Sequence, residues 1–258
     1  MDDIGKRLRR PCRLLALAFG LAAGAGAWGM DVRIAAQEAI APKWIATPER
    51  AAGICPDLMA AVERIEPRLH FTGYRRSRSL PGLEAGLESG SLDAACALVP
   101  TPRRRAIAVP AGKSVYLTRH LLVARAGDQA VVRDMQDLVR LGALVTSQRG
   151  SAFTERLKEA GVRVDDASDD HGLNLRKMLG GHGRFAYVNE LSLQRALRSE
   201  DLAARMRVLP VVLGAEPAYF WVSRKADPAL AALLGNAIDK LKANGELDRI
   251  YKRWSATP

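Results

Sequence analysis

The sequence predicts an α/β protein made of two lobes. Strand-like and helix-like segments alternate along the chain, and the alternation starts again near residue 141. The chain has 258 residues, 48% of them hydrophobic, which is enough to bury two sizeable cores. Two successive runs of alternating elements favour two α/β units over one long sheet.

Residues 1–27 have the layout of a secretory signal peptide. A basic segment, MDDIGKRLRRPCR, precedes 14 apolar residues and small residues in Ala-x-Ala spacing, so we expect cleavage after Ala27. The apolar stretch is shorter than the ~20 residues of a spanning helix. The sequence therefore predicts a mature protein that is exported to the periplasm.

The net charge of +11 would by itself favour a nucleic-acid partner. Signal removal takes away five basic and two acidic groups and lowers the charge from +11 to +8. An exported basic protein meets anionic solutes rather than the chromosome, and aromatic residues for base stacking make up only 5%. We therefore predict no nucleic-acid partner.

The first half of the mature chain predicts strands, two helices and an arginine-rich turn. Alternating or apolar runs predict strands at 31–36, 69–74, from Asp93 and at 120–126. Pro56 at a helix start and apolar residues at helical spacing predict a helix over 55–65. A short helix followed by a Gly-rich turn is expected within 78–92.

The second half repeats the pattern and closes with two helices. The predicted strands are 141–147, 162–168, 184–190, 207–213 and 218–224, and the predicted helices are 151–161, 171–181 and 191–206. Two further amphipathic helices are predicted over 227–245 and 246–254.

The order of four stretches resembles the bacterial periplasmic solute-binding proteins of the polar amino-acid type (family 3). The stretches are GICPDL at 53–58, LPGLEAGLESGSLDAAC at 80–96, TPRRRAIAVPAGKSVY at 101–116 and DPALAALLGNAIDKLKANGELDRIYKRW at 227–254. The resemblance covers nearly the whole mature chain. Ile54 stands where an aromatic residue is usual in the family.

This resemblance implies a type II periplasmic binding protein fold whose two lobes are joined by two crossing strands. Lobe one would comprise 30–121 plus 214–258, and lobe two 122–213. The implied function is binding of a small carboxylate-bearing ligand, an amino acid or organic acid, for delivery by a monomer to an inner-membrane ABC permease. The alternatives are a transporter-independent binding or sensing protein and, less favoured, a dehydratase-like enzyme.

The resemblance gives the TPRRR segment a role in ligand binding. The arginine three residues after Thr101 is Arg104, which would hold the ligand's α-carboxylate, with Arg105 as the alternative by counting from Asp93. A guanidinium has a planar fork that matches a carboxylate and does not lose its charge. Three arginines on a solvated turn are the simpler interpretation.

The other implied contacts come from lobe two and the first loop. Gly150 and Ser151 open a helix and would offer N–H groups and a hydroxyl to an anion. Asn189 stands where the family has an aspartate that accepts an ammonium, and Glu190 follows it. An amide brings no charge, so an acid without an ammonium becomes an alternative to an amino acid. Trp44 would either stack on the ligand or seal lobe one.

Cysteine and histidine patterns do not predict an enzyme, a cofactor or a metal site. Cys55 and Cys96 fit either a disulfide or two buried thiols in the mature chain. The four histidines are scattered and match no metal-binding or nucleophile motif. We therefore expect a binding protein with no catalytic residue and no cofactor.

Overall fold

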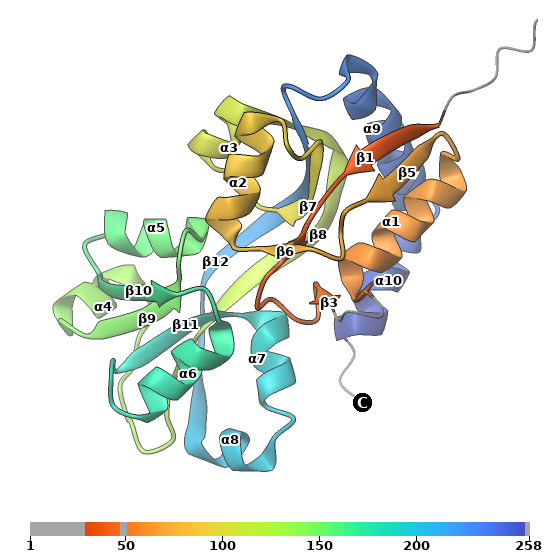
Figure 1. Cartoon of the computed structure of the whole chain (residues 1–258). Coiled ribbons are helices and arrows are strands. Elements are labelled where there is room, and N and C mark those ends of the chain that lie inside the picture. The colour runs from red at the N-terminus through yellow and green to blue at the C-terminus, as the bar shows by residue number, and fades with distance from the viewer. Residues whose placement is uncertain (1–28, 47–50, 256–258) are drawn as a thin grey trace, which may run out of the picture.

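The fold is a two-lobed α/β structure in a computed structural model that describes residues 29–46 and 51–255 (Figure 1). The predicted signal peptide, residues 1–27, lies outside the described residues. The α/β fold class predicted from the sequence is confirmed.

Lobe one contains the N-terminal elements and the two C-terminal helices. Its elements are β1 (Met30–Arg33), β2 (Ala36–Gln37), β3 (Ile45–Ala46), β4 (Ala51–Ala52), α1 (Ile54–Ile65), β5 (Leu69–Thr72), β6 (Ser77–Arg78), α2 (Leu80–Ser89), β7 (Ala94–Leu98), α3 (Pro102–Ile107), α9 (Pro228–Ala243) and α10 (Glu246–Ser255). Helix α1 packs against both α9 and α10, so the two ends of the described chain close one core.

Lobe two contains the middle of the chain. Its elements are α4 (Met135–Arg140), β9 (Leu144–Gln148), α5 (Ala152–Glu159), β10 (Arg163–Ser168), α6 (His171–Leu179), β11 (Phe185–Asn189), α7 (Glu190–Ala196) and α8 (Glu200–Arg205). Strands β10, β9 and β11 run parallel, so their carboxyl ends meet at one edge of the sheet.

Two strands of 18 residues connect the lobes, β8 (Ala108–Arg125) and β12 (Met206–Ser223). They pair antiparallel along most of their length within one sheet of order β10-β9-β11-β8-β12-β7. The predicted lobe limits, at 121/122 and 213/214, fall inside these two strands. Both lobes therefore share one continuous hydrogen-bonded ribbon (Figure 1).

Several predicted element boundaries differ from the structure. The separate strands at 207–213 and 218–224 form the single strand β12, and the strand at 120–126 is the end of β8. Pairing with a remote strand keeps the backbone extended at the less apolar residues that interrupt the hydrophobic pattern of each strand. The helix predicted over 191–206 is two helices, because Ser199 is extended and starts α8. Helices α3 and α4 were not predicted.

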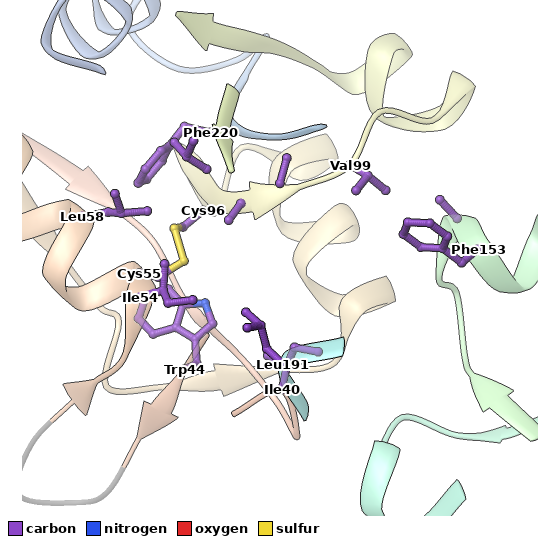
Figure 2. Close-up of a cluster of buried hydrophobic side chains, with 14 of the residues drawn as sticks. Ile40, Trp44, Ile54, Cys55, Leu58, Cys96, Val99, Phe153, Leu191 and Phe220 are labelled. Atoms are coloured by element: carbon purple, nitrogen blue, oxygen red, sulfur yellow. A yellow bond between two sulfur atoms is a disulfide. The ribbon is translucent and has the colours of Figure 1, made fainter. Parts of the chain in front are cut away.

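The core of lobe one surrounds a disulfide between Cys55 on α1 and Cys96 on β7. Figure 2 shows this bond next to the indole of Trp44 and the side chains of Ile54 and Leu58. Trp44 is buried in this cluster, with 4% of its surface exposed. Hydrophobic side chains and the disulfide thus lie around its ring.

Removing the disulfide should destabilise lobe one. The bond joins residues 41 positions apart, and loss of a link of this length costs roughly 2–4 kcal/mol of unfolding free energy. We expect urea unfolding of a Cys55→Ala/Cys96→Ala variant to show that loss of unfolding free energy. The wild type unfolded under strongly reducing conditions should show the same loss. A variant with an unchanged urea midpoint would contradict the prediction.

Candidate functional site

Both lobes and the connecting strand β8 line a small cavity of about 50 Å³. The lining residues are Gln37, Ile40, Lys43, Leu80, Ala97, Leu98, Val99, Arg104, Tyr116, Thr118, His120, Gln148, Ser151, Ala152, Phe153 and Asn189. Gln37, Gln148 and Asn189 are each the last residue of a strand. Ligands of open α/β folds bind at such strand ends.

Arg104 enters the cavity from α3. Thr101 begins this helix, and its Oγ1 accepts a hydrogen bond of 3.0 Å from the Arg104 backbone N–H. The guanidinium Nη1 donates to the Val99 carbonyl at 2.7 Å, and Nε lies 2.9 Å from Glu84 Oε1. Nη2 and Nε are both buried, and neither makes a hydrogen bond within the described residues, although Nε lies within ion-pair distance of Glu84. Nη2 is therefore a buried charged donor without an acceptor in the described chain.

Glu84 is the anionic partner of Arg104, and it is shared with a second arginine. Burial lowers the pKa of Arg104, which is 1% exposed, and the neighbouring Glu84 carboxylate opposes that effect. Arginine stays protonated even so. Glu84 also pairs with Arg103 at 3.2 Å, and Arg103 pairs with Glu88 at 3.0 Å, so two carboxylates serve two guanidinium groups.

The structure separates the three arginines of the TPRRR segment. Arg103 and Arg105 are exposed, and only Arg104 is buried in the cavity wall. Arg105, the alternative from the sequence, is not among the residues that line the cavity. Thr101 itself acts through its helix cap and lines a neighbouring cavity together with Gly150.

Lys43 is a second basic side chain in the same cavity, and the sequence did not point to it. Its Nζ donates to Gln37 Oε1 and to the Ala97 carbonyl, both at 2.7 Å. Ala97 has a left-handed φ of 54°, which is unusual for a residue with a Cβ. The first N–H groups of α1 donate to the carbonyls of Pro42 and Lys43, both at 3.1 Å, and so hold the loop.

Gly53 allows α1 to approach that loop. Its φ is +121°, and a Cβ there would lie 2.4 Å from the Pro42 carbonyl oxygen. No side chain larger than hydrogen fits without displacing the backbone that carries Lys43.

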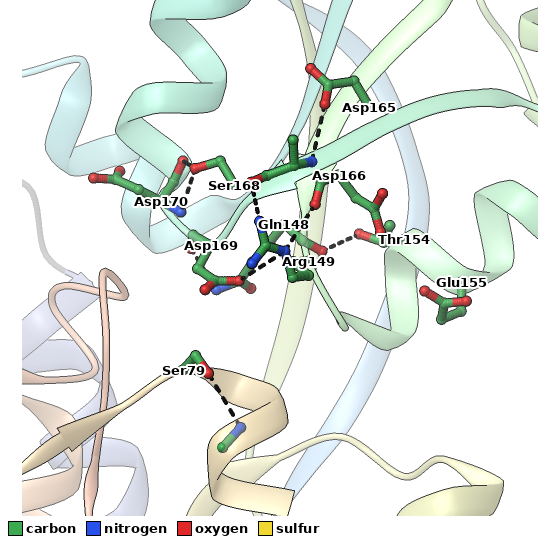
Figure 3. Close-up of polar contacts among 12 residues, drawn as sticks. Ser79, Gln148, Arg149, Thr154, Glu155, Asp165, Asp166, Ser168, Asp169 and Asp170 are labelled. Atoms are coloured by element: carbon green, nitrogen blue, oxygen red, sulfur yellow. Dashed lines mark hydrogen bonds and ion pairs between the residues drawn. The ribbon is translucent and has the colours of Figure 1, made fainter.

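Lobe two contributes Ser151 and Gln148 at the start of α5. Ser151 Oγ accepts from the Phe153 N–H at 3.2 Å, and the Thr154 hydroxyl donates to the Gln148 carbonyl at 2.7 Å. Figure 3 shows Gln148 among polar residues of this lobe, with Ser79 of lobe one on the opposite side. Gly150 lies outside this cavity but has the positive φ of +66° that the turn before α5 requires.

Asn189 lines the cavity but presents a different group from the one expected. Its Oδ1 accepts from the N–H groups of Leu191 and Ser192, at 3.0 and 3.3 Å, and so caps α7. The amide oxygen is thereby engaged with the helix, which leaves the amide N–H groups for a ligand. This geometry favours a ligand acceptor over a ligand ammonium.

An aromatic surface forms another wall of the cavity. The His120 ring stacks on Phe153 with centroids 3.9 Å apart, and His171 lies 5.9 Å away. Burial, reinforced by His171, holds the pKa of His120 well below its usual value. His120 is therefore neutral near pH 7. A Cβ at Gly214, opposite His120 in β12, would lie 2.7 Å from the Phe153 ring.

The lobes touch on both sides of the cavity. Ser192 of α7 donates to the Ala41 carbonyl of lobe one at 3.0 Å, and Gly150 lies against the ring of Pro81. Trp44 lines a different cavity, of about 590 Å³, which shares Gln37 and Ile40 with the first.

Other site types lack support within residues 29–46 and 51–255. None of the helices there is long and apolar enough to cross a bilayer. That part of the chain also brings together no three His, Cys, Asp or Glu residues suited to a metal ion.

Comparison with known proteins assigns the family. The profile of the bacterial extracellular solute-binding proteins, family 3, matches residues 32–257, and the chain belongs to this family. The resemblance inferred from the sequence is thus confirmed. No curated protein sequence matches the chain.

Three solved structures share the fold at low identity. A histidine kinase sensor domain with similarity to periplasmic binding proteins has a TM-score of 0.75 at 17% identity, covering 88% of this chain and 96% of its own. An ancestral arginine-binding protein bound to glutamine has a TM-score of 0.71 at 19% identity, and the match covers 87% of this chain and 97% of that protein. The substrate-binding protein of an amino acid ABC transporter has a TM-score of 0.70 at 16% identity, and the match covers 87% of this chain and 99% of that protein. The type II binding-protein fold is therefore confirmed.

Removing the Glu84 carboxylate should destabilise the protein strongly. Arg104 would then be a buried cation without an anionic partner, and breaking such a pair from one side costs about 3 kcal/mol or more. Glu84→Ala should therefore lower the free energy of unfolding in urea by that amount. Glu88→Ala is the matched control, since Glu88 is exposed and pairs only with the exposed Arg103. Equal losses in the two variants would contradict the prediction.

Proposed function

We propose that this protein binds a small carboxylate-bearing solute in the cavity between its lobes. Arg104 anchors the carboxylate, and Ser151 and the Asn189 amide contact the solute from lobe two. The lobes, about 30–121 plus 214–258 and 122–213, close on it through β8 and β12. Ligand binding is the role of the family to which the chain belongs.

The observation that carries this proposal is the unpartnered Nη2 of Arg104. A buried donor without an acceptor costs free energy, and a charged one costs more. A ligand carboxylate would satisfy this donor. Charge-assisted bonds from a guanidinium are among the strongest that a binding site offers.

We further propose that the protein works in the periplasm, after cleavage at Ala27, and delivers its solute to an ABC permease. The similar binding protein of an amino acid ABC transporter supports this output. The similar histidine kinase sensor domain supports the second candidate, a binding protein that signals instead. Loss of solute uptake on deleting the gene would favour transport. Unchanged uptake would overturn the transport role and leave solute binding untouched.

Ligand binding should be detectable as a gain in thermal stability. A micromolar ligand binds with about 8 kcal/mol, and a hundredfold excess over Kd adds about 2.7 kcal/mol to the stability of the folded state. We expect amino acids or organic acids in a thermal-shift screen of the mature protein to raise Tm by several degrees.

Arg104→Lys should weaken binding of any acid found in this screen by about tenfold or more, because an ammonium lacks the planar fork. Arg105→Lys is the matched control, because Arg105 is the exposed neighbour, and its affinity should equal that of the wild type. Calorimetric Kd values decide the comparison. Unchanged affinity in Arg104→Lys would overturn the anchor, and loss in Arg105→Lys alone would move it to Arg105.

A further inference from the structure

We infer that Lys43 is a second anion-binding side chain in this cavity and that the ligand is a compact dicarboxylate without an ammonium group. The inference rests on the proposed function, because it adds a second contact to the solute that Arg104 anchors. A cavity of about 50 Å³ limits the ligand to a small molecule.

Lys43 is a buried basic group without an anionic partner. It is 6% exposed, and its two hydrogen-bond partners, Gln37 Oε1 and the Ala97 carbonyl, are neutral. No described carboxylate lies within ion-pair distance of its Nζ, whereas the Arg104 guanidinium has Glu84 at 2.9 Å. An ammonium has three donors, so one remains. Burying such a charge against neutral oxygens alone is costly, and a second ligand carboxylate would compensate it.

The same lining is unfavourable for a ligand ammonium. The cavity is lined by two basic side chains, Lys43 and Arg104, and by no Asp or Glu of the described chain. The Asn189 oxygen is already bonded to the N-terminus of α7. An amino acid would therefore place its ammonium beside the Arg104 guanidinium with no carboxylate in the lining to accept it, whereas a dicarboxylate without an amine would not.

The protonation of Lys43 gives the inference a direct readout. Burial and the charge of Arg104 hold the pKa of Lys43 well below its usual value in the free protein. A bound dianion raises the pKa of Lys43. At any pH between the pKa of the free protein and that of the complex, Lys43 therefore takes up a proton when the ligand binds. Affinity should accordingly fall as the pH rises through the bound pKa.

The other ionisable groups in the lining stay in one protonation state above neutral pH. Arg104 stays charged, burial raises the pKa of Tyr116, and burial lowers that of His120. Proton uptake by the complex above neutral pH therefore reports Lys43.

The test is calorimetry of the mature protein with acids of matched size. Oxalate, malonate and succinate vary the spacing of two carboxylates, while butyrate and aspartate match succinate in carbon number with one carboxylate or an added ammonium. We expect the best dicarboxylate to bind at least about tenfold more tightly than butyrate and aspartate. The binding enthalpy of that dicarboxylate, measured in buffers of different ionisation enthalpy, should change with the buffer in the sense of proton uptake by the complex.

Lys43→Met should remove both the preference for the dicarboxylate over butyrate and the proton uptake. Lys113→Met, at an exposed lysine of the same lobe, is the control and should change neither. Circular dichroism checks that both variants fold. Tighter binding of aspartate, or an undiminished preference in Lys43→Met, would overturn the inference. If acids bind through Arg104 without any preference for two carboxylates, the proposed function stands and this inference fails. If no acid binds, both fail.

Discussion

The buried positive charge between the lobes is the constraint on which the site depends. Arg104 can stay charged at 1% exposure only because Glu84 on α2 lies 2.9 Å from its Nε and the Val99 carbonyl accepts from its Nη1. These contacts tie α3 to α2 and to the end of β7. Glu84 is shared with Arg103, and Lys43 adds a buried basic group that no described carboxylate contacts. The proposed anion would give partners to these buried donors.

The connecting strands place that charge opposite lobe two. Because β8 and β12 are hydrogen-bonded along most of their length, one shared ribbon joins the lobes. His120 lies on β8, pairs with Gly214 of β12, and stacks on Phe153 of α5. This stacking places α5 of lobe two against the wall that the connecting strand gives to the cavity.

Membership of the solute-binding family defines the class of protein, and the lining residues define how this chain differs within it. The sequence resemblance places Asn189 where an ammonium-accepting aspartate is usual, and the structure turns the amide oxygen toward α7 instead. Lys43 occupies the same cavity. Both features change the charge that the site presents, and neither changes the fold.

The sequence by itself determined the α/β class, the family and most helices, because hydrophobic periodicity and helix-start signals are local. The resemblance to the family also pointed to Arg104, by counting from Thr101, with Arg105 as the alternative, and the structure buries Arg104. The sequence did not point to Lys43 or Glu84, and it split β12 in two. A lysine between a proline and a tryptophan carries no local signal of burial, and only the packing of α1 against its loop hides it from water. The pairing of Cys55 with Cys96 and the position of Trp44 were likewise decided by tertiary packing, because distance between remote residues is not encoded in local pattern.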